Sequence, residues 1–507
     1  MPGPSEDHDR TLTIATGLAA FLLILLGTLV EWRSLLNNDV GWLLHVAERV
    51  LAGDVLYRDV IEINPPLIVW LNLPLAWLTL QTHLPKVAVV RIAVLLVMLG
   101  SVTLVTLLVR FSRLLPRHRT VLLAVLVLVT FPFAYFGQRE HLILALMLPW
   151  FLVAMCSMAG EKLPSWARTV TGLLLGIAIS LKPHYILAWL LPLGYVAWVR
   201  RSTAVLRSSE QLAAAATIAG YAVSVLLVTP EYLELVRRMG AAYLQWLPET
   251  VRTMLLGNPG GIAAMGILLV YILARRGRPA TDVLALGLVG FLIGVLLQKR
   301  GSDYHYYPAV GLGLILLGLT ASQGPRARRL AGVGFGILAG TLLFIAGSQA
   351  FGSEAGEMGD YRELRRALSP VDTTTSLLSL SPRGGLPFEL VNHAGAKWAL
   401  RFPFPIVPAL IYSRQLDAGA PIVYHPPAER PPLEQWFVNT VLDDAERLRP
   451  SIILIHIPST SVDGRDLRMD FAAYFSVEPR FRELLTHYRY TGQAEGFRIY
   501  RRLPGTG

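Results

Sequence analysis

The chain has 507 residues, of which 53% are hydrophobic and only 16% are charged, and its mean hydropathy is +0.49. Soluble domains carry about 25% charged residues, so this composition excludes a cytosolic enzyme, a disordered scaffold and a fibrous repeat. Long apolar stretches separated by short arginine-rich loops indicate a mostly α, polytopic membrane protein. The net charge of +11 is typical of basic cytoplasmic loops, so we expect membrane lipid as a partner and no nucleic acid.

Eleven apolar stretches predict about eleven transmembrane helices. They lie at 11–31, 87–109, 120–136, 142–159, 169–181, 185–199, 211–229, 259–274, 281–297, 308–322 and 330–348. Most arginines of the short connections fall in every second loop, and the alternate loops hold only Arg139, Lys182, Lys299 and Arg300. The positive-inside rule therefore predicts a cytoplasmic N-terminus and an extracytoplasmic C-terminus.

Residues 1–350 form the predicted transmembrane domain, with two long outer loops at 32–86 and 230–258. The first loop contains an amphipathic helix near 40–52 and an apolar piece at 67–80 that suits a helix in the membrane interface. Residues 351–507 are richer in charge and predict an extracytoplasmic α/β domain. Within it we expect a buried strand at 451–457, a helix at 479–488 and a hairpin over 489–502.

The first candidate for chemistry is Asp39, which follows the first apolar stretch directly. A carboxylate at the outer membrane face can act as a general base. The Asn38-Asp39 pair can equally cap the helix that follows, which is a very common use of these residues. Both readings stay open, and one residue can do both.

The second candidate is the polar run Arg139-Glu140-His141 between two apolar stretches. Snorkelling to the interface explains Arg139, but it explains Glu140 and His141 less well. Lys182 lies at a similar break, where two short apolar stretches meet at Lys182-Pro183-His184. Short segments joined at a charged, proline-bearing break often line a substrate cavity.

The third candidate is the run from Gln298 to Pro308. Lys299 and Arg300 are cations on the outer side, where they suit the phosphate of an anionic lipid. The alternative is an interfacial belt of aromatic residues, including Tyr304 and Tyr307, with two accompanying cations.

These pieces occur in a recognisable order. The order is Asp39, then Gly53-Asp54-Val55-Leu56-Tyr57-Arg58-Asp59, Asn64-Pro65-Pro66-Leu67, Glu140-His141, and a late Lys-x-x-x-x-Tyr-x-Tyr-Tyr-Pro beginning at Lys299. Over about residues 1–350 the chain resembles the GT-C superfamily of polyprenyl-phosphate-dependent glycosyltransferases. The branch it resembles contains the protein O-mannosyltransferases and the lipid A aminoarabinose transferases.

The resemblance implies a role for each candidate. Asp39 becomes the catalytic base or acceptor-orienting residue, with Asp59 as the next choice, and Glu140 becomes the second catalytic acid. The implied contacts to the donor are made by Lys299, Arg300, Tyr304 and Tyr307, with Lys182 or Arg139 as further cations and His141 bonded to the sugar or to Glu140. Some relatives use a divalent cation, which Asp39 and Glu140 would bind together.

Two positions depart from the family pattern. Val40 follows Asp39 where the O-mannosyltransferases have Asp-Glu, and Asn64 stands where the aminoarabinose transferases have the lysine of Lys-Pro-Pro. One phosphate contact of those relatives is therefore missing, and Lys182 is the substitute that we predict.

The expected activity is an inverting transfer of a sugar from a polyprenyl-phosphate donor to a hydroxyl on a lipid, glycan or protein. We expect it at the periplasmic face of a bacterial inner membrane. A carrier or flippase for lipid-linked sugars is the alternative, because it would use the same cations without an acceptor-side carboxylate. An extracytoplasmic receptor rarely needs eleven spans.

Overall fold

The computed structural model describes residues 4–505 apart from 246–248, 276, 278, 352–356, 383–384, 418–420 and 460–467. Its elements form two compact units. The first unit comprises Met1–Asn37, Val90–Leu226 and Glu249–Ser353, and the second comprises Asn38–Val89, Leu227–Pro248 and Glu354–Gly507. Each unit is described by itself below.

The first unit is helical. Its main helices are α1 (Pro4–Arg33), α4 (Lys86–Phe111), α5 (Arg117–Val125), α6 (Arg139–Met158), α7 (Ser165–Leu181), α8 (Leu187–Val199), α9 (Ser209–Val228), α11 (Pro259–Ala274), α12 (Pro279–Gln298), α13 (Tyr307–Thr320) and α14 (Pro325–Phe351). Shorter turns connect them, namely η1 (Leu126–Thr130), η2 (Phe133–Tyr135), η3 (Pro183–Ile186), η4 (Thr203–Arg207), η5 (Thr253–Gly257) and η6 (Asp303–Tyr306). Each of the eleven predicted apolar stretches thus overlaps a helix, although the stretch at 120–136 is divided among α5, η1 and η2. Helices α1, α4, α6, α9, α12 and α14 are long and apolar enough to cross a membrane.

Burial separates the inner helices of this unit from the outer ones. Nearly every residue of α13 is buried, and α6 and α12 are largely buried too, as expected for helices that are apolar on all sides. In contrast, α1, α9 and α14 expose large apolar side chains such as Leu18, Leu227 and Phe344. Exposed apolar surface of this extent marks a lipid-facing side, so the predicted polytopic helical membrane fold is confirmed.

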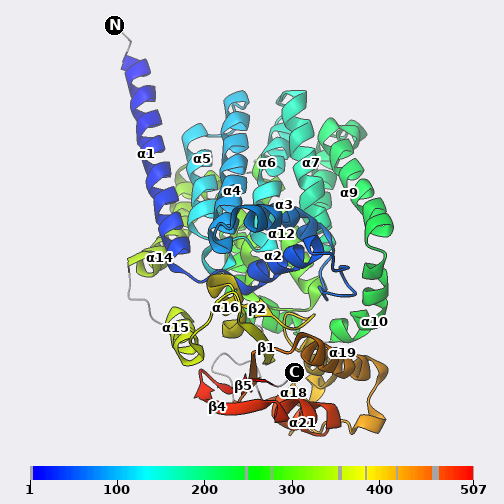
Figure 1. The fold of residues 1–507 in the computed structure, drawn as a ribbon. Helices are drawn as coiled ribbons and strands as arrows, with labels where there is room; N and C mark the ends of the chain where they lie inside the picture. The colour runs from blue at the N-terminus through cyan, green and yellow to red at the C-terminus, as the bar shows by residue number, and fades with distance from the viewer. Residues whose placement is uncertain are drawn as a thin grey trace. The chain divides into compact units, whose positions relative to one another are not determined.

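Small residues allow helices of this unit to approach one another closely. A side chain at Gly172 of α7 would meet the backbone of Glu210 on α9, and one at Gly290 of α12 would meet the backbone of Ala188 on α8. Close backbone approach at small residues is the usual way in which membrane helices associate. Figure 1 shows α6 and α7 side by side, and α6 also packs against α12 and α13.

The second unit contains the helices of the two long loops at 32–86 and 230–258 that the sequence predicts to lie outside. They are α2 (Asn38–Leu51), α3 (Leu67–Thr82) and α10 (Glu231–Gln245). The amphipathic α2 buries its apolar face, including Trp42 and Val46, and packs against α3. Trp42 also donates from Nε1 to Glu62 Oε2 at 2.6 Å. The two helices predicted in the first outer loop are therefore present.

The rest of the second unit is an α/β domain around a five-stranded sheet. Its strands are β1 (Ser376–Leu380), β2 (Lys397–Trp398), β3 (Ile452–His456), β4 (Tyr488–Ala494) and β5 (Phe497–Arg502), in the order β2-β1-β3-β5-β4. β1 runs parallel to β2 and β3, whereas β5 is antiparallel to β3 and β4. The surrounding helices are α15 (Glu357–Leu368), α16 (Gly385–Ala394), α17 (Ile406–Ile411), α18 (Ser413–Asp417), η7 (Pro427–Glu429), α19 (Pro432–Leu448), α20 (Phe471–Ser476) and α21 (Pro479–Thr486).

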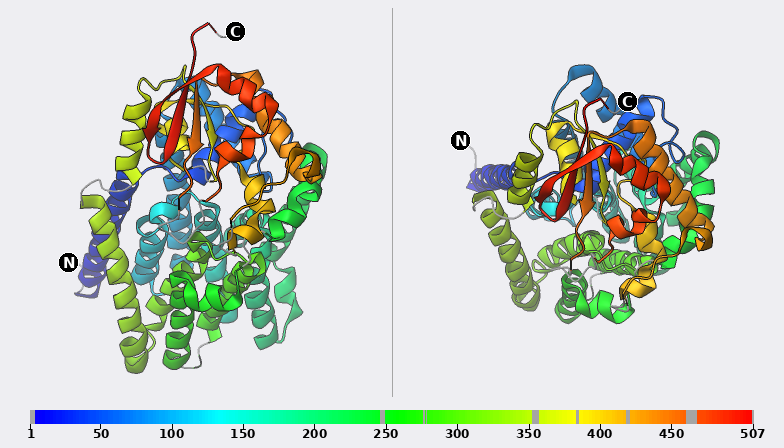
Figure 2. Two further views of the ribbon diagram at one scale, coloured as in Figure 1. Left: turned by 90° about the horizontal axis from the view of Figure 1, so that it is seen from below. Right: turned by 60° about the horizontal axis from the view of Figure 1, so that its bottom comes forward.

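Helices cover both faces of this sheet. Figure 2 shows the strands with α15 on one side and the orange and red helices α19 to α21 on the other. Every residue of β3 is buried, which explains the unbroken apolar run from Ile452 to Ile455. The predicted strand, the helix near 479–488 and the terminal hairpin are all confirmed, with Glu495 and Gly496 forming the hairpin turn at positive φ.

Candidate functional site

The centre of the first unit's polar cluster is a buried ion pair. Glu140 lies in the first turn of α6 and is fully buried, and Lys182 follows the last residue of α7 with only 5% exposure. The Lys182 ammonium donates a hydrogen bond to Glu140 Oε1. Because isolated buried charges cost several kcal/mol, each residue compensates the charge of the other. The break at Lys182-Pro183-His184 thus places the Lys182 ammonium within hydrogen-bond distance of the Glu140 carboxylate.

Two residues from η6 complete this cluster, which we call the Glu140 cluster (Glu140, Lys182, Tyr304 and His305). His305 Nε2 lies 3.7 Å from Glu140 Oε1, and the Lys182 ammonium lies 5.5 Å from the centre of the Tyr304 ring. The ring of His305 is bonded through Nδ1 to the backbone oxygen of Arg300 at 3.1 Å. Since that oxygen can only accept, Nδ1 carries the proton, and Nε2 presents a lone pair in the neutral ring. Burial, reinforced by Lys182, holds the pKa of His305 well below its usual value, which keeps the ring neutral.

The second carboxylate oxygen of Glu140 does not take part in the bond to Lys182. Oε2 is buried and has no hydrogen-bond partner among the residues that the structure describes. A buried polar atom without a partner calls for an explanation, such as an ordered water or a functional group of a ligand. The arrangement can therefore accept one further hydrogen bond into the cluster.

His141 and Tyr307 both bind backbone groups of the first unit. The ring of His141 is fully buried, where Nδ1 accepts from the Gly137 N–H at 3.1 Å and Nε2 bonds the Leu128 oxygen at 2.7 Å. The Tyr307 hydroxyl donates to the Val127 oxygen at 2.5 Å. In this conformation the polar atoms of both side chains bind backbone, and the predicted roles in sugar and phosphate binding remain predictions.

Lys299 and Arg300 lie in the loop between α12 and η6. Lys299 is exposed and adopts a left-handed conformation (φ 54°), and its backbone oxygen accepts from the Glu249 N–H at 2.9 Å. Asn258 fixes the same loop by donating to the Gly301 oxygen at 2.8 Å. The loop is thus held through its backbone, and an exposed lysine of this kind is suited to meet an anion.

Arg139 is partly buried next to Glu140, at the start of α6. Asp39 and Asp59 belong to the second unit. Asp39 is exposed in the first turn of α2, where a carboxylate interacts favourably with the helix dipole. The helix starts at Asn38, so Asp39 lies inside the helix and not at the cap position.

Asp59 supports its own loop. Its Oδ2 accepts from the Val55 N–H at 2.9 Å and from Arg58 at 3.0 Å. The hydrogen bond from Arg58 is the main cause of the lowered pKa of Asp59. This geometry accounts for Asp59 without a substrate.

A divalent ion fits the Glu140 cluster poorly. The Lys182 ammonium already bonds Glu140, and it would repel a second cation at the same carboxylate. Within the described part of the chain, no group of three histidine, cysteine or acidic side chains could hold a metal ion. The residues of the Glu140 cluster therefore do not support the divalent ion that the resemblance implies for some relatives.

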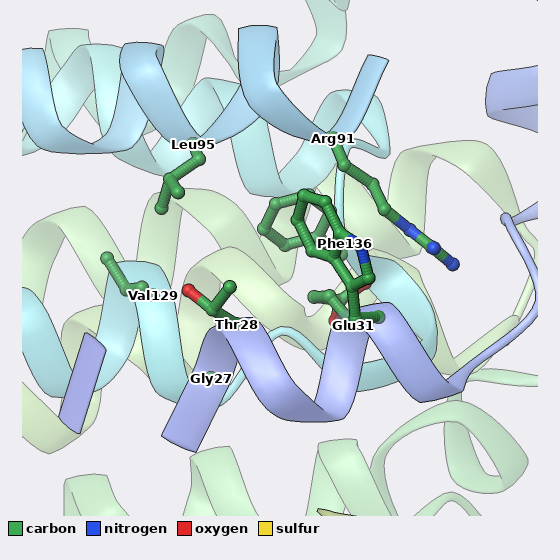
Figure 3. Close-up of a pocket in the computed structure, with 8 residues that line it drawn as sticks. Gly27, Thr28, Glu31, Arg91, Leu95, Val129 and Phe136 are labelled. Atoms are coloured by element: carbon green, nitrogen blue, oxygen red, sulfur yellow. The ribbon is translucent and has the colours of Figure 1, made fainter. Parts of the chain in front are cut away.

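A separate cavity lies between α1, α4 and η1. Figure 3 shows Leu95 and Val129 at one end and Glu31 and Arg91 towards the other. Its volume of about 10 Å³ has room for roughly one water molecule. It is too small for a sugar or a lipid chain.

Comparison with known proteins identifies the fold. No protein-family model matches the sequence, and no curated protein sequence matches it. Among solved structures, ArnT from Cupriavidus metallidurans bound to undecaprenyl phosphate matches with a TM-score of 0.56, covering 97% of this chain and 98% of that one. The two chains share one fold. Their sequences are only 13% identical, and the likeness to ArnT includes the C-terminal domain.

The resemblance that the motif order predicts is therefore confirmed at the level of the fold, and the likeness to ArnT extends beyond residue 350. One member of the cluster was not among the predicted site residues. His305 lies within the run at 298–308, but a histidine among tyrosines gave no sequence signal of its own. Its burial and its bond to the Arg300 oxygen mark it only in the structure.

Proposed function

We propose that the protein is a membrane glycosyltransferase that moves a sugar from a polyprenyl-phosphate donor to an acceptor hydroxyl, with inversion at the anomeric carbon. The observation that carries the proposal is the match to ArnT over nearly the whole of both chains. The buried Glu140 cluster supports it, because a charged pair with a spare acceptor atom is a costly feature inside a helical membrane protein.

The proposed reaction has one displacement step. Asp39 takes the proton of the acceptor hydroxyl, whose oxygen then forms a bond to the anomeric carbon of the sugar. The bond between that carbon and the phosphate oxygen breaks, and polyprenyl phosphate leaves with the electron pair. Lys299 and Arg300 stabilise the charge that develops on the leaving phosphate. Lys182 is not assigned to the phosphate, since it is bonded to Glu140.

The test is turnover by the purified full-length protein in nanodiscs. Polyprenyl phosphates that carry hexoses or pentoses are mixed with a panel of lipid, glycan and peptide acceptors. Release of polyprenyl phosphate with a matching gain in acceptor mass supports a transferase. Movement of labelled donor between leaflets of proteoliposomes without such release would identify the carrier instead.

We further propose that the reaction takes place on the extracytoplasmic face of a bacterial inner membrane. The support is the concentration of basic residues in alternate short loops, which predicts an extracytoplasmic C-terminus. Reporters of periplasmic and cytoplasmic location fused after residue 507 should report the periplasm. A cytoplasmic result would place Glu140, Lys182 and Lys299 on the inner face.

A further inference from the structure

The two oxygens of Glu140 have different surroundings. Oε1 is bonded to the Lys182 ammonium, whereas Oε2 is buried and has no hydrogen-bond partner among the described residues. His305 cannot supply the missing donor, because its Nδ1 proton points to the Arg300 oxygen and its Nε2 faces Oε1. An unsatisfied carboxylate oxygen in a buried site is destabilising, and a ligand that donates a hydrogen bond to it would remove that cost.

We infer that Glu140 Oε2 accepts a hydrogen bond from an uncharged hydroxyl of the donor sugar, and that Lys182 is the positioning residue that holds the Glu140 side chain in place for this contact. The inference rests on the proposed function and deepens it, because it selects the chemical class of the transferred sugar.

The charge balance of the cluster favours a hydroxyl over an amine. Lys182 already neutralises Glu140, and Arg139 lies next to it in the chain, so an ammonium group on the sugar would add an uncompensated positive charge. An anionic group would be repelled by the carboxylate. A neutral hydroxyl forms a strong charge-assisted bond to the carboxylate and leaves the net charge of the cluster unchanged.

The bond between the Glu140 cluster and the loop that holds Lys299 and Arg300 indicates that this hydroxyl belongs to the donor. His305 contacts Glu140 on one side and is bonded to the Arg300 oxygen on the other. Arg300 and Lys299 are the cations to which the proposed function assigns the donor phosphate. A group that binds next to them is the sugar attached directly to that phosphate.

Lys182 has two effects on Glu140. Its charge compensates that of a carboxylate that is fully buried, and its hydrogen bond fixes Oε1. Without the ammonium, the buried carboxylate lacks a compensating charge unless another cation takes its place. Removal of Lys182 should therefore change which sugars the protein accepts, and not merely weaken the fold.

The experiment measures the ratio of kcat/KM for a parent donor to that for a modified donor, using full-length protein in nanodiscs. The modified donors are a series of monodeoxy sugars and a series in which one hydroxyl is replaced by an amino group. A ratio measured in one preparation does not depend on the fraction of protein that is folded, so variants of reduced stability remain informative.

For the wild type we expect that one deoxy position lowers kcat/KM by roughly 10- to 100-fold, as for loss of a hydrogen bond to a charged group. The amino donor with its nitrogen at that position should be used as poorly. In Lys182→Met the amino donor should gain at least about 10-fold relative to the parent, because its ammonium replaces the missing cation. In the double variant Glu140→Gln with Lys182→Met, the kcat/KM ratio of parent to deoxy donor and that of parent to amino donor should both fall to within a few fold of unity.

Two matched controls use the same chemical changes elsewhere in the unit. Glu210→Gln alters a buried glutamate whose two oxygens are both bonded by Arg168, and Lys162→Met alters an exposed lysine. Neither should change the donor ratios.

Each outcome decides the inference. If no deoxy donor lowers kcat/KM in an active wild type, the inference is overturned and the proposed function stands. The same holds if Glu140→Gln loses activity without any change in the donor ratios, since Glu140 would then act on the acceptor or only on the fold. A preference of the wild type for amino donors would overturn it as well. Absence of polyprenyl phosphate release from every donor would instead contradict the proposed function.

Discussion

Two buried glutamates in the first unit, Glu140 and Glu210, have the same side chain and different partners. Glu210 lies at the start of α9, and the guanidinium of Arg168 binds its two oxygens at 2.8 and 2.9 Å. Glu140 is bonded through one oxygen to Lys182, and its other oxygen has no hydrogen-bond partner in the described structure.

We propose that the difference separates a structural carboxylate, Glu210, from one that binds a ligand, Glu140. A planar guanidinium satisfies both oxygens of a carboxylate with fixed geometry, so Glu210 has nothing left to offer a ligand. An ammonium is a compact charge that binds one oxygen and leaves the other available. Burial alone therefore does not identify a binding residue, and the partner of each oxygen is the informative observation.

The largest expected effect concerns a third carboxylate, the exposed Asp39. Asp39→Asn should lower turnover by roughly 10²- to 10⁴-fold, which is the usual contribution of an acid or base. The asparagine keeps the shape of the side chain, so thermal stability should change little. Initial rates and melting temperatures of both proteins provide the check, and near-normal turnover would remove Asp39 from the mechanism.

If Asp39→Asn remained active, Glu140 would be the leading candidate for the base instead of Asp39. The same rates measured for Glu140→Gln distinguish the two cases. A base at Glu140 predicts a loss with every donor, whereas the hydroxyl contact predicts a loss that depends on the sugar.

The next effect is on stability. Glu210→Gln removes the charge that compensates the partly buried Arg168, and we expect the free energy of unfolding to fall by roughly 1–3 kcal/mol. Activity per folded molecule should stay the same. Thermal unfolding in detergent, together with turnover corrected for folded protein, tests both statements. A variant with normal stability and reduced turnover would contradict the structural role of this pair.

Lys299 should have a smaller effect than Asp39, and it should act on the donor. Lys299→Ala is expected to raise the KM for the donor by roughly 10-fold, in line with loss of one hydrogen bond to a charged group. Lys299→Arg should restore only part of this loss, because the wider guanidinium does not reproduce a compact ammonium.

The measurement is the initial rate against donor concentration for the three proteins, with acceptor affinity as the internal control. Equal donor dependence in all three would make Lys299 an interfacial anchor. The phosphate role would then pass to Arg300 or Arg139.

Much of the fold could be predicted from the sequence, because apolar length and period are local properties. The eleven apolar stretches, the amphipathic α2 and the strand at β3 all follow from them. Pairings between distant segments have no such signal. The bond from Lys182 to Glu140 joins residues 42 positions apart, and the bond from Tyr307 to Val127 joins residues 180 apart.

The sequence therefore indicates the regions that contribute to the Glu140 cluster better than it indicates the contacts between them. Polar residues at the ends of apolar stretches indicated Glu140, Lys182 and the run at 298–308. The sequence could not show that His141 and Tyr307 bind backbone oxygens. Hydrogen bonds to backbone depend on how the ends of the helices meet, which the residue types alone do not reveal.

The smallest effect is expected at Asp59, which is more exposed than either buried glutamate. Its carboxylate bonds Arg58 and the Val55 N–H, and the bond from Arg58 is the main cause of its lowered pKa. Both side chains reach solvent, so Asp59→Asn should destabilise the protein by only about 0.5 kcal/mol at pH 7, and turnover should remain within a few fold of the wild type.

The pH dependence of this effect has a defined sign. Because the pKa of Asp59 is lower in the folded state than in the unfolded chain, its stabilising contribution is complete above the unfolded value of about 4 and disappears as the pH falls through the folded value. Wild type and Asp59→Asn should therefore differ in unfolding free energy at pH 7 and converge towards pH 3. Arg58→Gln is the matched control. Because it removes the partner of the Asp59 carboxylate, adding Asp59→Asn to it should no longer give a pH-dependent difference in unfolding free energy. A loss of turnover in Asp59→Asn at unchanged stability would instead make this carboxylate part of the active site.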